Sequence, residues 1–508
     1  MIAELKKREK SYTRWLSRVG ANPPVQQPFG LDWEQKYLPH YLTEAPSLFH
    51  RDLIDDLSTF HLTRGVKKVY RGPRGSGKTS HISKAYPLWA AVENVEPMTL
   101  LLAETGPGQS ETYLRAIKAE LEGNEALKRD YPNACGIGPV WRSERIKLRN
   151  GAVIVAKGSG SRILGMTDKA TRPTLVIGDD LNARTDAYSP TTRTRRLAWF
   201  STDVMSVGNI KTTNYLIAGT SIHREAVVCA LTNNSAWETR GYASIMQWPK
   251  NMELWAQWER VASNLGSANR REEALAFYAA NKAAMDDGAI VVWPERESIY
   301  DLMDFRRAIG PAAFDSEKND KPGSDGTTEW ASEYFDRNDF FFNEWPDDIL
   351  ASVLAIDPSK GASDKSDFQA FAMVGVSRKD GTIYAEMFLG REDVTAMVGR
   401  SLDIAKGFKP SEICVEENGT MGMILPEYNR QMIERGQIFP LMAITQTEAK
   451  VVRIRGLTGY LARSQLRIRN THSGKLTVEQ MRDFPSGAND DGPDALALAV
   501  KRLEVLLS

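Results

Sequence analysis

The chain has 508 residues, of which 42% are hydrophobic, and its 65 Lys and Arg residues balance 65 Asp and Glu residues. This length exceeds what one hydrophobic core usually supports, so we expect two or more domains. The balanced charge excludes a strongly basic protein, and any nucleic-acid surface must be local, with residues 142–149 and 453–455 as candidates.

The three cysteines, Cys135, Cys229 and Cys414, lie far apart in the sequence, which argues against disulfides and against a zinc site. No apolar run is long enough to span a bilayer, and the N-terminus lacks the apolar core of a signal peptide. We therefore expect a soluble, intracellular protein.

The first motif in chain order is a glycine-rich loop. Residues 1–47 are expected to form a helical segment that is partly irregular because prolines interrupt it. Residues 66–70 are expected to form a strand. The sequence GPRGSGKT then follows, which fits G-x-x-x-x-G-K-[ST] without a mismatch. Such a loop binds phosphates with backbone N–H groups and a lysine, and its hydroxyl residue ligates Mg²⁺. The sequence therefore predicts a nucleotide site formed by Gly72, Pro73, Arg74, Gly75, Ser76, Gly77, Lys78, Thr79 and Ser80.

Two further strands are expected to end near this loop. The apolar run before Asp179 and Asp180 delivers two carboxylates to a strand end, where Asp179 can hold Mg²⁺ and Asp180 can orient or deprotonate the attacking water. The run over 214–218 ends in Gly219, Thr220 and Ser221, small polar residues at the place of a γ-phosphate sensor.

Phosphoryl transfer also needs an arginine to offset developing charge. Arg74 lies within the loop and can act on the same subunit's nucleotide. Arg162 lies on a glycine- and serine-rich loop and is our candidate for reaching a neighbouring subunit, with Arg172 as its rival.

Beyond about residue 348 a second α/β pattern begins. Strands are expected to end at Asp357 and at Glu416, and an apolar helix is expected to start near Asp491. Three such carboxylates can bind a pair of divalent metals that activate water and cleave a phosphodiester. Within the last group we rank Asp491 first and Asp494 second, because helix geometry does not separate them; two possible accessory ligands are Asp364 and Asp367.

In their order along the chain, these motifs resemble the large terminase of tailed bacteriophages, the DNA-packaging motor subunit. The residues that carry the resemblance are 72–79, 172–173 with 175–180, 219–223, 293–296, 314–322, 356–358, 416–419, and 490–491 with 494–495.

The resemblance implies a P-loop ATPase of the additional-strand type, a mostly parallel sheet with flanking helices, followed by an RNase H-like nuclease domain. With the changes in composition, we divide the chain into an N-terminal helical segment (1–47), an ATPase domain with a helical subdomain (48–325), a linker (326–347) and a nuclease domain (348–508).

The resemblance also implies roles for individual residues. Lys78 and Thr79 would bind ATP and Mg²⁺, Asp179 would be the metal carboxylate, Asp180 would activate water, and residues 219–221 would form the coupling motif. Asp357, Glu416 and Asp491 would bind the nuclease metals. These metals would be Mg²⁺ ions, for which Mn²⁺ can substitute.

The implied partners are double-stranded DNA, the portal of the procapsid and a small terminase subunit. The chain would form a homo-oligomeric ring, a pentamer, when docked and would be monomeric in isolation, in the cytoplasm of the host cell. Two alternatives stay open: a cellular helicase-nuclease of DNA repair, and a nucleotide-dependent DNA-binding scaffold that does not cleave.

Overall fold

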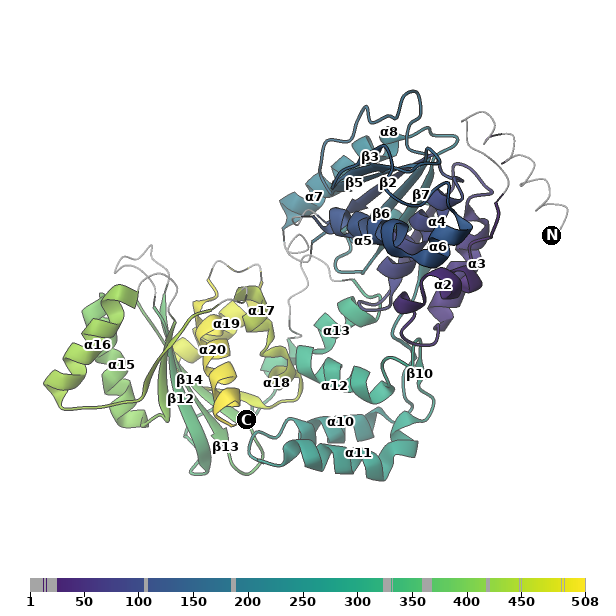
Figure 1. Cartoon of the computed structure of the whole chain (residues 1–508). Helices are drawn as coiled ribbons and strands as arrows, with labels where there is room; N and C mark the ends of the chain where they lie inside the picture. The colour runs from purple at the N-terminus through teal and green to yellow at the C-terminus, as the bar shows by residue number, and fades with distance from the viewer. Residues whose placement is uncertain are drawn as a thin grey trace. The chain divides into compact units, whose positions relative to one another are not determined.

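The computed structural model describes residues 25–104, 108–183, 189–322, 332–358, 368–416, 421–446, 450–485 and 489–507, with residues 12, 15, 330, 448 and 487 (Figure 1). It has two compact units. The N-terminal unit comprises Met1–Trp248, Ala289–Leu302 and Phe314–Asp325, and the C-terminal unit comprises Pro249–Gly288, Met303–Ala313 and Gly326–Ser508. The chain therefore passes between the units five times, after residues 248, 288, 302, 313 and 325. Our division at residues 326–347 had assigned 249–288 and 303–313 to the first domain, whereas these segments pack in the C-terminal unit.

The N-terminal unit alternates helices and strands. Its helices are α2 (Leu31–Tyr37), η1 (Pro39–Tyr41), α3 (Leu48–Phe60), η2 (Ser80–Ala85), α4 (Tyr86–Val92), α5 (Gln109–Gly123), α6 (Glu125–Asp130), α7 (Pro190–Trp199), η4 (Phe200–Val204), α8 (Met205–Val207) and α9 (Val227–Thr232). Its strands are β1 (Lys67–Arg71), β2 (Met98–Ala103), β3 (Val140–Trp141), β4 (Arg145–Lys147), β5 (Val153–Gly158), β6 (Leu175–Asp179), β7 (Asn214–Gly219), β8 (Glu238–Gly241), β9 (Ile245–Gln247) and β10 (Ile290–Val291).

The C-terminal unit has the same mixed character. Its helices are α10 (Met252–Ala262), α11 (Arg270–Asp286), α14 (Glu333–Asp336), α15 (Val394–Phe408), α16 (Met421–Arg435), α17 (Lys450–Arg455), α18 (Thr458–Ala462), α19 (His472–Asp483) and α20 (Asp491–Leu506), and two more, α12 (Ile299–Ile309) and α13 (Pro311–Lys318), each run from one unit into the other. Its strands are β11 (Phe341–Phe342), β12 (Ile349–Asp357), β13 (Gln369–Ser377), β14 (Ile383–Gly390), β15 (Glu412–Glu416), β16 (Leu441–Ile444) and β17 (Leu466–Arg469).

The sheet of the N-terminal unit has the strand order β3-β4-β5-β2-β6-β7-β1-β8. All pairs from β5 to β8 are parallel, and β3 and β4 add an antiparallel edge. Successive side chains of a strand point to opposite faces, and a sheet of this kind buries both. Leu101 of β2 accordingly packs in a core with Trp89 of α4, whereas Leu100 and Leu102 pack in a second core with Phe200 of η4. Helices therefore cover both faces of this sheet (Figure 1).

The sheet of the C-terminal unit has the order β11-β17-β14-β13-β12-β15-β16. Its strands β12, β13 and β14 form an antiparallel meander, and β15 and β16 continue the sheet in parallel with β12. Val353 of β12 packs in a core with Leu496 of α20, whereas its neighbour Leu354 packs in another with Leu402 of α15 and Tyr428 of α16. Both units are thus mixed α/β with many parallel pairs, which confirms the predicted class at this level.

None of the helices in the described part of the chain combines the length and the apolar composition that a membrane crossing needs.

Helix α20 offers a matched test of this packing. Leu496 is fully buried and Leu506, on the same helix, is 39% exposed. We expect Leu496→Ala to lower the free energy of unfolding of the C-terminal unit by about 2–5 kcal/mol, because the substitution leaves a cavity. Leu506→Ala, the same chemical change at a partly exposed position, should shift the urea midpoint much less. Equal shifts of the two midpoints would contradict the placement of α20 against the sheet.

Candidate functional site

The glycine-rich loop lies at the carboxyl end of β1. Helical backbone begins at Lys78, so the loop ends at a helix N-terminus, the arrangement that binds phosphate. Gly77 has φ +79°, and a Cβ there would lie 2.9 Å from His50 Nε2. The same His50 nitrogen lies 2.6 Å from the carbonyl oxygen of Ser76. The sequence alone did not single out this histidine, which belongs to α3 and contacts the loop backbone at Ser76.

Lys78 is buried and has both charged and neutral partners. Its Nζ donates to the carbonyl oxygens of Gly72 and Pro73, each at 2.8 Å. Burial lowers the pKa of Lys78, and the carboxylates of Asp180 and Asp179 act against that shift. The ammonium group is therefore held inside the loop, within the electrostatic influence of two acids.

Asp179 ends β6 and is fully buried. Its Oδ2 accepts a hydrogen bond from Ser83 Oγ at 2.8 Å, while its Oδ1 has no hydrogen-bond partner among the described residues. Burial, followed by repulsion from Asp180, raises the pKa of the Asp179 carboxyl, and hydrogen bonds from Thr79 and Ser83 oppose this. An unpartnered buried carboxylate oxygen beside a threonine hydroxyl is a set of hard oxygen donors, so these residues fit Mg²⁺.

Two other buried hydroxyl oxygens near this loop, Ser76 Oγ and Thr220 Oγ1, are likewise unpartnered within the part of the chain that the structure describes. Unsatisfied buried polar atoms are costly, so both hydroxyl groups would gain from a bound polar group. Thr220 follows β7, which lies next to β1, where Arg71 pairs with Gly219. The loop and the end of β7 therefore share one edge of the sheet.

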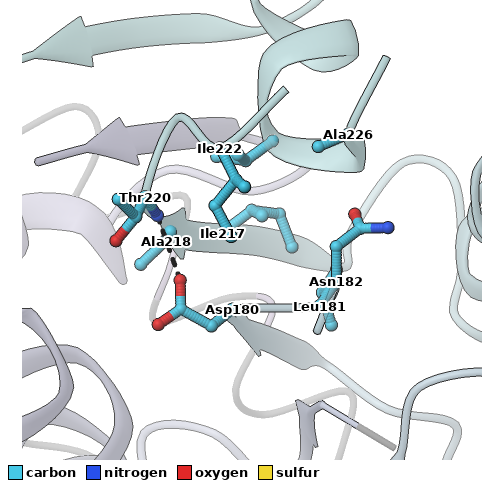
Figure 2. Close-up of a pocket in the computed structure, with 10 residues that line it drawn as sticks. Asp180, Leu181, Asn182, Ile217, Ala218, Thr220, Ile222 and Ala226 are labelled. Atoms are coloured by element: carbon cyan, nitrogen blue, oxygen red, sulfur yellow. Dashed lines mark hydrogen bonds between the residues drawn. The ribbon is translucent and has the colours of Figure 1, made fainter. Parts of the chain in front are cut away.

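Asp180 contacts the strand end that the sequence analysis assigned to coupling. Its Oδ1 accepts a hydrogen bond from the backbone N–H of Thr220 at 3.0 Å, and its own backbone has φ +44° (Figure 2). A cavity of about 10 Å³ lies beside this contact, lined by Ile217 and Ile222 among others. That volume admits about one water molecule, so a nucleotide does not enter it.

Arg74 is held by a residue far away in the sequence. Its Nε donates to Glu317 Oε2 at 2.5 Å, across 243 residues, and its backbone N–H donates to the Glu317 carbonyl at 2.8 Å. Three residues further on, Asp320 accepts a hydrogen bond from Ser221 Oγ and lies 3.2 Å from Arg71. The segment 314–322 belongs to the resemblance noted above, but spacing gives no sign of these contacts.

The two other candidate arginines, Arg162 and Arg172, are exposed on the loop between β5 and β6. The described structure does not bring either of them to the glycine-rich loop through a hydrogen bond or an ion pair.

In the C-terminal unit, three carboxylates converge from β12, β15 and α20. Ile356 pairs with Val415 in parallel register, so Asp357 and Glu416 end adjacent strands at the same edge. One oxygen from each of Asp357, Glu416 and Asp494 lies within 4.8 Å of the other two. Burial, followed by repulsion from Asp494 and Glu416, raises the pKa of Asp357 to about 7. Three oxygen donors that repel one another fit a hard divalent cation such as Mg²⁺ or Mn²⁺.

The structure favours Asp494 over Asp491 as the third member, the reverse of our ranking. Asp491 is also buried, but its Oδ2 accepts the backbone N–H of Phe368 at 3.0 Å, and it does not belong to the group found among the described residues. The two positions are three residues apart on one helix, so their order depends on how α20 packs. Asp364 and Asp367 lie outside the described residues.

Two basic residues of α17 were missed as site residues. Arg453 donates to Asp494 through Nε at 3.0 Å and through Nη2 at 2.6 Å, and lies 3.6 Å from Glu416. Lys450 Nζ lies 2.7 Å from Asp490 and 3.6 Å from Asp494. The basic run 453–455 pointed to a local nucleic-acid surface, whereas Arg453 is buried and paired with the acids.

The raised pKa of Asp357 predicts how stability depends on pH and metal. Without metal, the folded state holds a proton that the unfolded state has lost between about pH 4 and 7, so stability falls as the pH rises through that window. In EDTA, Asp357→Asn should therefore have a higher melting temperature than the wild type at about pH 8, and little difference at about pH 4.

Excess Mg²⁺ should reverse that order at the higher pH, because an amide binds the cation more weakly than a carboxylate does. Asp491→Asn is the matched control: since Asp491 lies outside the three-carboxylate group, this variant should keep the rise in melting temperature that Mg²⁺ gives the wild type. If Mg²⁺ leaves the wild-type melting temperature unchanged, the three carboxylates do not form a metal site.

No family model matches the chain, and no curated protein matches it. Among solved structures, the nuclease of the large terminase from the thermophilic phage G20c has a TM-score of 0.24 and 15% identity, covering 32% of this chain and 86% of that one. The nuclease domain of the large terminase subunit gp2 of the bacterial virus Sf6 has a TM-score of 0.22 and 11% identity, covering 30% and 87%. RuvC from Thermus thermophilus has a TM-score of 0.19 and 19% identity, covering 31% and 95%. Over about a third of its length, the chain is thus similar to phage large terminase nucleases and to RuvC.

Proposed function

We propose that the chain is a viral DNA-packaging motor subunit that hydrolyses ATP to move double-stranded DNA and cleaves that DNA with divalent metal ions. The observation that carries the proposal is the convergence of Asp357, Glu416 and Asp494 within 4.8 Å, in a unit other than the one that holds the glycine-rich loop. Two acidic centres on one chain suit two hydrolytic reactions.

For the nuclease, Asp357, Glu416 and Asp494 would hold the metal, which supplies Lewis-acid activation of water and of the scissile phosphate. Asp491, which the sequence analysis ranked first, lies one helical turn from Asp494 and accepts the backbone N–H of Phe368, so we give it no metal-binding role. Lys450 and Arg453 offset part of the acidic charge and would approach the phosphate backbone. The antiparallel meander followed by two parallel strands agrees with the proposed RNase H-like fold.

For the ATPase, Lys78 would bind the β/γ-phosphates, and Thr79 with Asp179 would hold Mg²⁺. Asp180, fixed by the Thr220 N–H, would take the proton of the attacking water on its other oxygen. Because Asp180 contacts the end of β7, loss of the γ-phosphate would alter the contacts of residues 219–221, the proposed coupling motif. The position of β7 between β1 and β6 agrees with a sheet of the additional-strand type.

Arg74 would act in cis on the same nucleotide. Since Glu317 binds its Nε, the Nη groups remain to donate to phosphate oxygens. We therefore propose Glu317 as the residue that positions Arg74. Arg162, or its rival Arg172, would act on a neighbouring subunit's nucleotide within a ring, which is the reason to propose an oligomer, a pentamer on the portal.

The proposed partners are double-stranded DNA, the portal of the procapsid and a small terminase subunit, and the proposed location is the cytoplasm of the host cell. These rest on the resemblance of the motifs.

Separate loss of the two activities tests the function. In plasmid cleavage with Mn²⁺ or Mg²⁺, we expect Asp357→Ala to reduce cutting by at least about 100-fold while ATP hydrolysis continues. Lys78→Ala should reduce hydrolysis by a similar factor and leave metal-dependent cutting in place. A wild type that cuts under no metal condition would favour the scaffold alternative, and activity that portal and procapsid do not stimulate would favour the helicase-nuclease.

If Glu317 positions Arg74, its substitution should change the kcat of ATP hydrolysis more than the KM for ATP. We expect Glu317→Gln to lower the kcat of ATP hydrolysis by about tenfold, with the KM for ATP changed less than about threefold, because the ion pair that orients Arg74 is lost while Lys78 still binds. Glu317→Asp should recover part of the rate. Glu253→Gln, an exposed glutamate on α10, is the matched control. A purely structural role would instead lower the melting temperature and change kcat and KM together.

A further inference from the structure

A cavity in the C-terminal unit is lined by four arginines. Arg270 and Arg271 come from the start of α11, Arg307 from α12 and Arg463 from the end of α18. Its volume is about 310 Å³, whereas the cavities beside Asp180 and beside the glycine-rich loop measure about 10 Å³ each. A volume near 300 Å³ is at the lower end of the range for small-molecule sites. None of the residues assigned above to ATP, to metal or to DNA cleavage lines it.

The cavity concentrates positive charge at a buried position. The Arg463 side chain is 7% exposed, and its nearest carboxylate, Glu259, lies 3.4 Å away. Burial lowers the pKa of the Arg463 guanidinium, and the nearby Arg307 adds to that shift. Burying a charge is expensive unless it is well paired, so Arg463 would gain from a further anion.

Three carboxylates near the cavity already have partners, and for Asp304 and Glu259 the partner is an arginine of the cavity itself. Glu504 accepts a hydrogen bond from the Tyr460 hydroxyl, and Asp304 lies 2.8 Å from Arg307. With Glu259, they make three carboxylates against four guanidinium groups. These seven side chains together therefore carry one positive charge in excess.

Three further residues that line the cavity differ in their partners. Arg271 is exposed and has no carboxylate within ion-pair distance among the described residues, while Arg270 donates to the carbonyl oxygens of Ser267 and Leu507, at 3.3 and 3.2 Å. Ser263 Oγ is buried and unpartnered within the described part of the chain. The cavity thus offers guanidinium forks to a ligand.

We propose that this cavity binds a compact polyphosphate anion, such as inorganic tripolyphosphate or the polyphosphate group of a nucleotide. Guanidinium forks match phosphate oxygens bidentately, and several of them around one cavity suit an anion with more than one phosphate. A cavity of about 310 Å³ suits a small anion and not a DNA duplex. This site is separate from both proposed active centres and goes beyond the proposed function.

The test uses the full chain carrying Lys78→Ala, in EDTA, so that neither the glycine-rich loop nor a bound metal contributes to phosphate binding. Titration of inorganic tripolyphosphate by calorimetry should show one saturable site. Arg271→Gln and Arg307→Gln should each raise Kd by about tenfold or more, the usual loss for one charge-assisted contact. Lys282→Gln removes an exposed positive charge from α11 outside the cavity and should leave Kd within about twofold.

Equal Kd values for the Arg271, Arg307 and Lys282 variants, or the absence of a saturable site, would overturn the proposal, provided that circular dichroism shows all variants folded. Competition against bound tripolyphosphate separates the possible ligands. Displacement by ATP, ADP and pyrophosphate would show that the site recognises the polyphosphate group, whereas displacement by ATP and ADP but not by pyrophosphate would show that it recognises a nucleotide. Displacement by duplex DNA alone would overturn the proposal. The result is independent of the ATPase proposal, since it is measured with Lys78 already replaced.

Discussion

Buried carboxylates at the ends of strands are the constraint on which both candidate centres depend. Asp179 is fully buried, and Asp357 has a raised pKa mainly because it is desolvated and then because other acids face it. A chain does not keep such groups charged without a compensating cation. The neighbouring residues supply part of that compensation, Lys78 in one unit and Lys450 with Arg453 in the other. The remaining demand for positive charge is the reason why we propose a divalent metal at each centre.

Parallel strands explain why the acids meet. In a parallel pair the carboxyl ends lie at the same edge, so residues that follow adjacent strands become neighbours whatever their separation in the sequence. This brings the loop after β1 beside Asp180 and the end of β7, and it brings Asp357 beside Glu416. The helices that pack on the sheets then add what the strands lack: His50 behind the loop, and Asp494 with Arg453 at the second centre.

The sequence was sufficient for the parts that depend on local pattern. The strands that end at Asp179, Asp357 and Glu416 and the helix that starts near Asp491 all follow from apolar runs in the sequence. It was insufficient where packing decides. Asp491 and Asp494 have the same local signal, and only the packing of α20 and its ion pair with Arg453 separate them. The Arg74–Glu317 contact joins residues 243 positions apart, and no spacing rule anticipates it.

The five passages of the chain between the units bear on how the protein can be divided. Leu265, in the segment Pro249–Gly288, is buried in the same core as Val353 and Leu496 of the C-terminal unit. A Cβ on the next residue, Gly266, would lie 2.5 Å from the carbonyl oxygen of Arg378, so the two backbones are in close contact. A fragment that begins at residue 348 would lack this segment and expose the apolar surface that it covers. The C-terminal unit is therefore built from three separate segments of the chain and is not contained in one continuous stretch. A single proteolytic cut would break the backbone without releasing either unit in complete form.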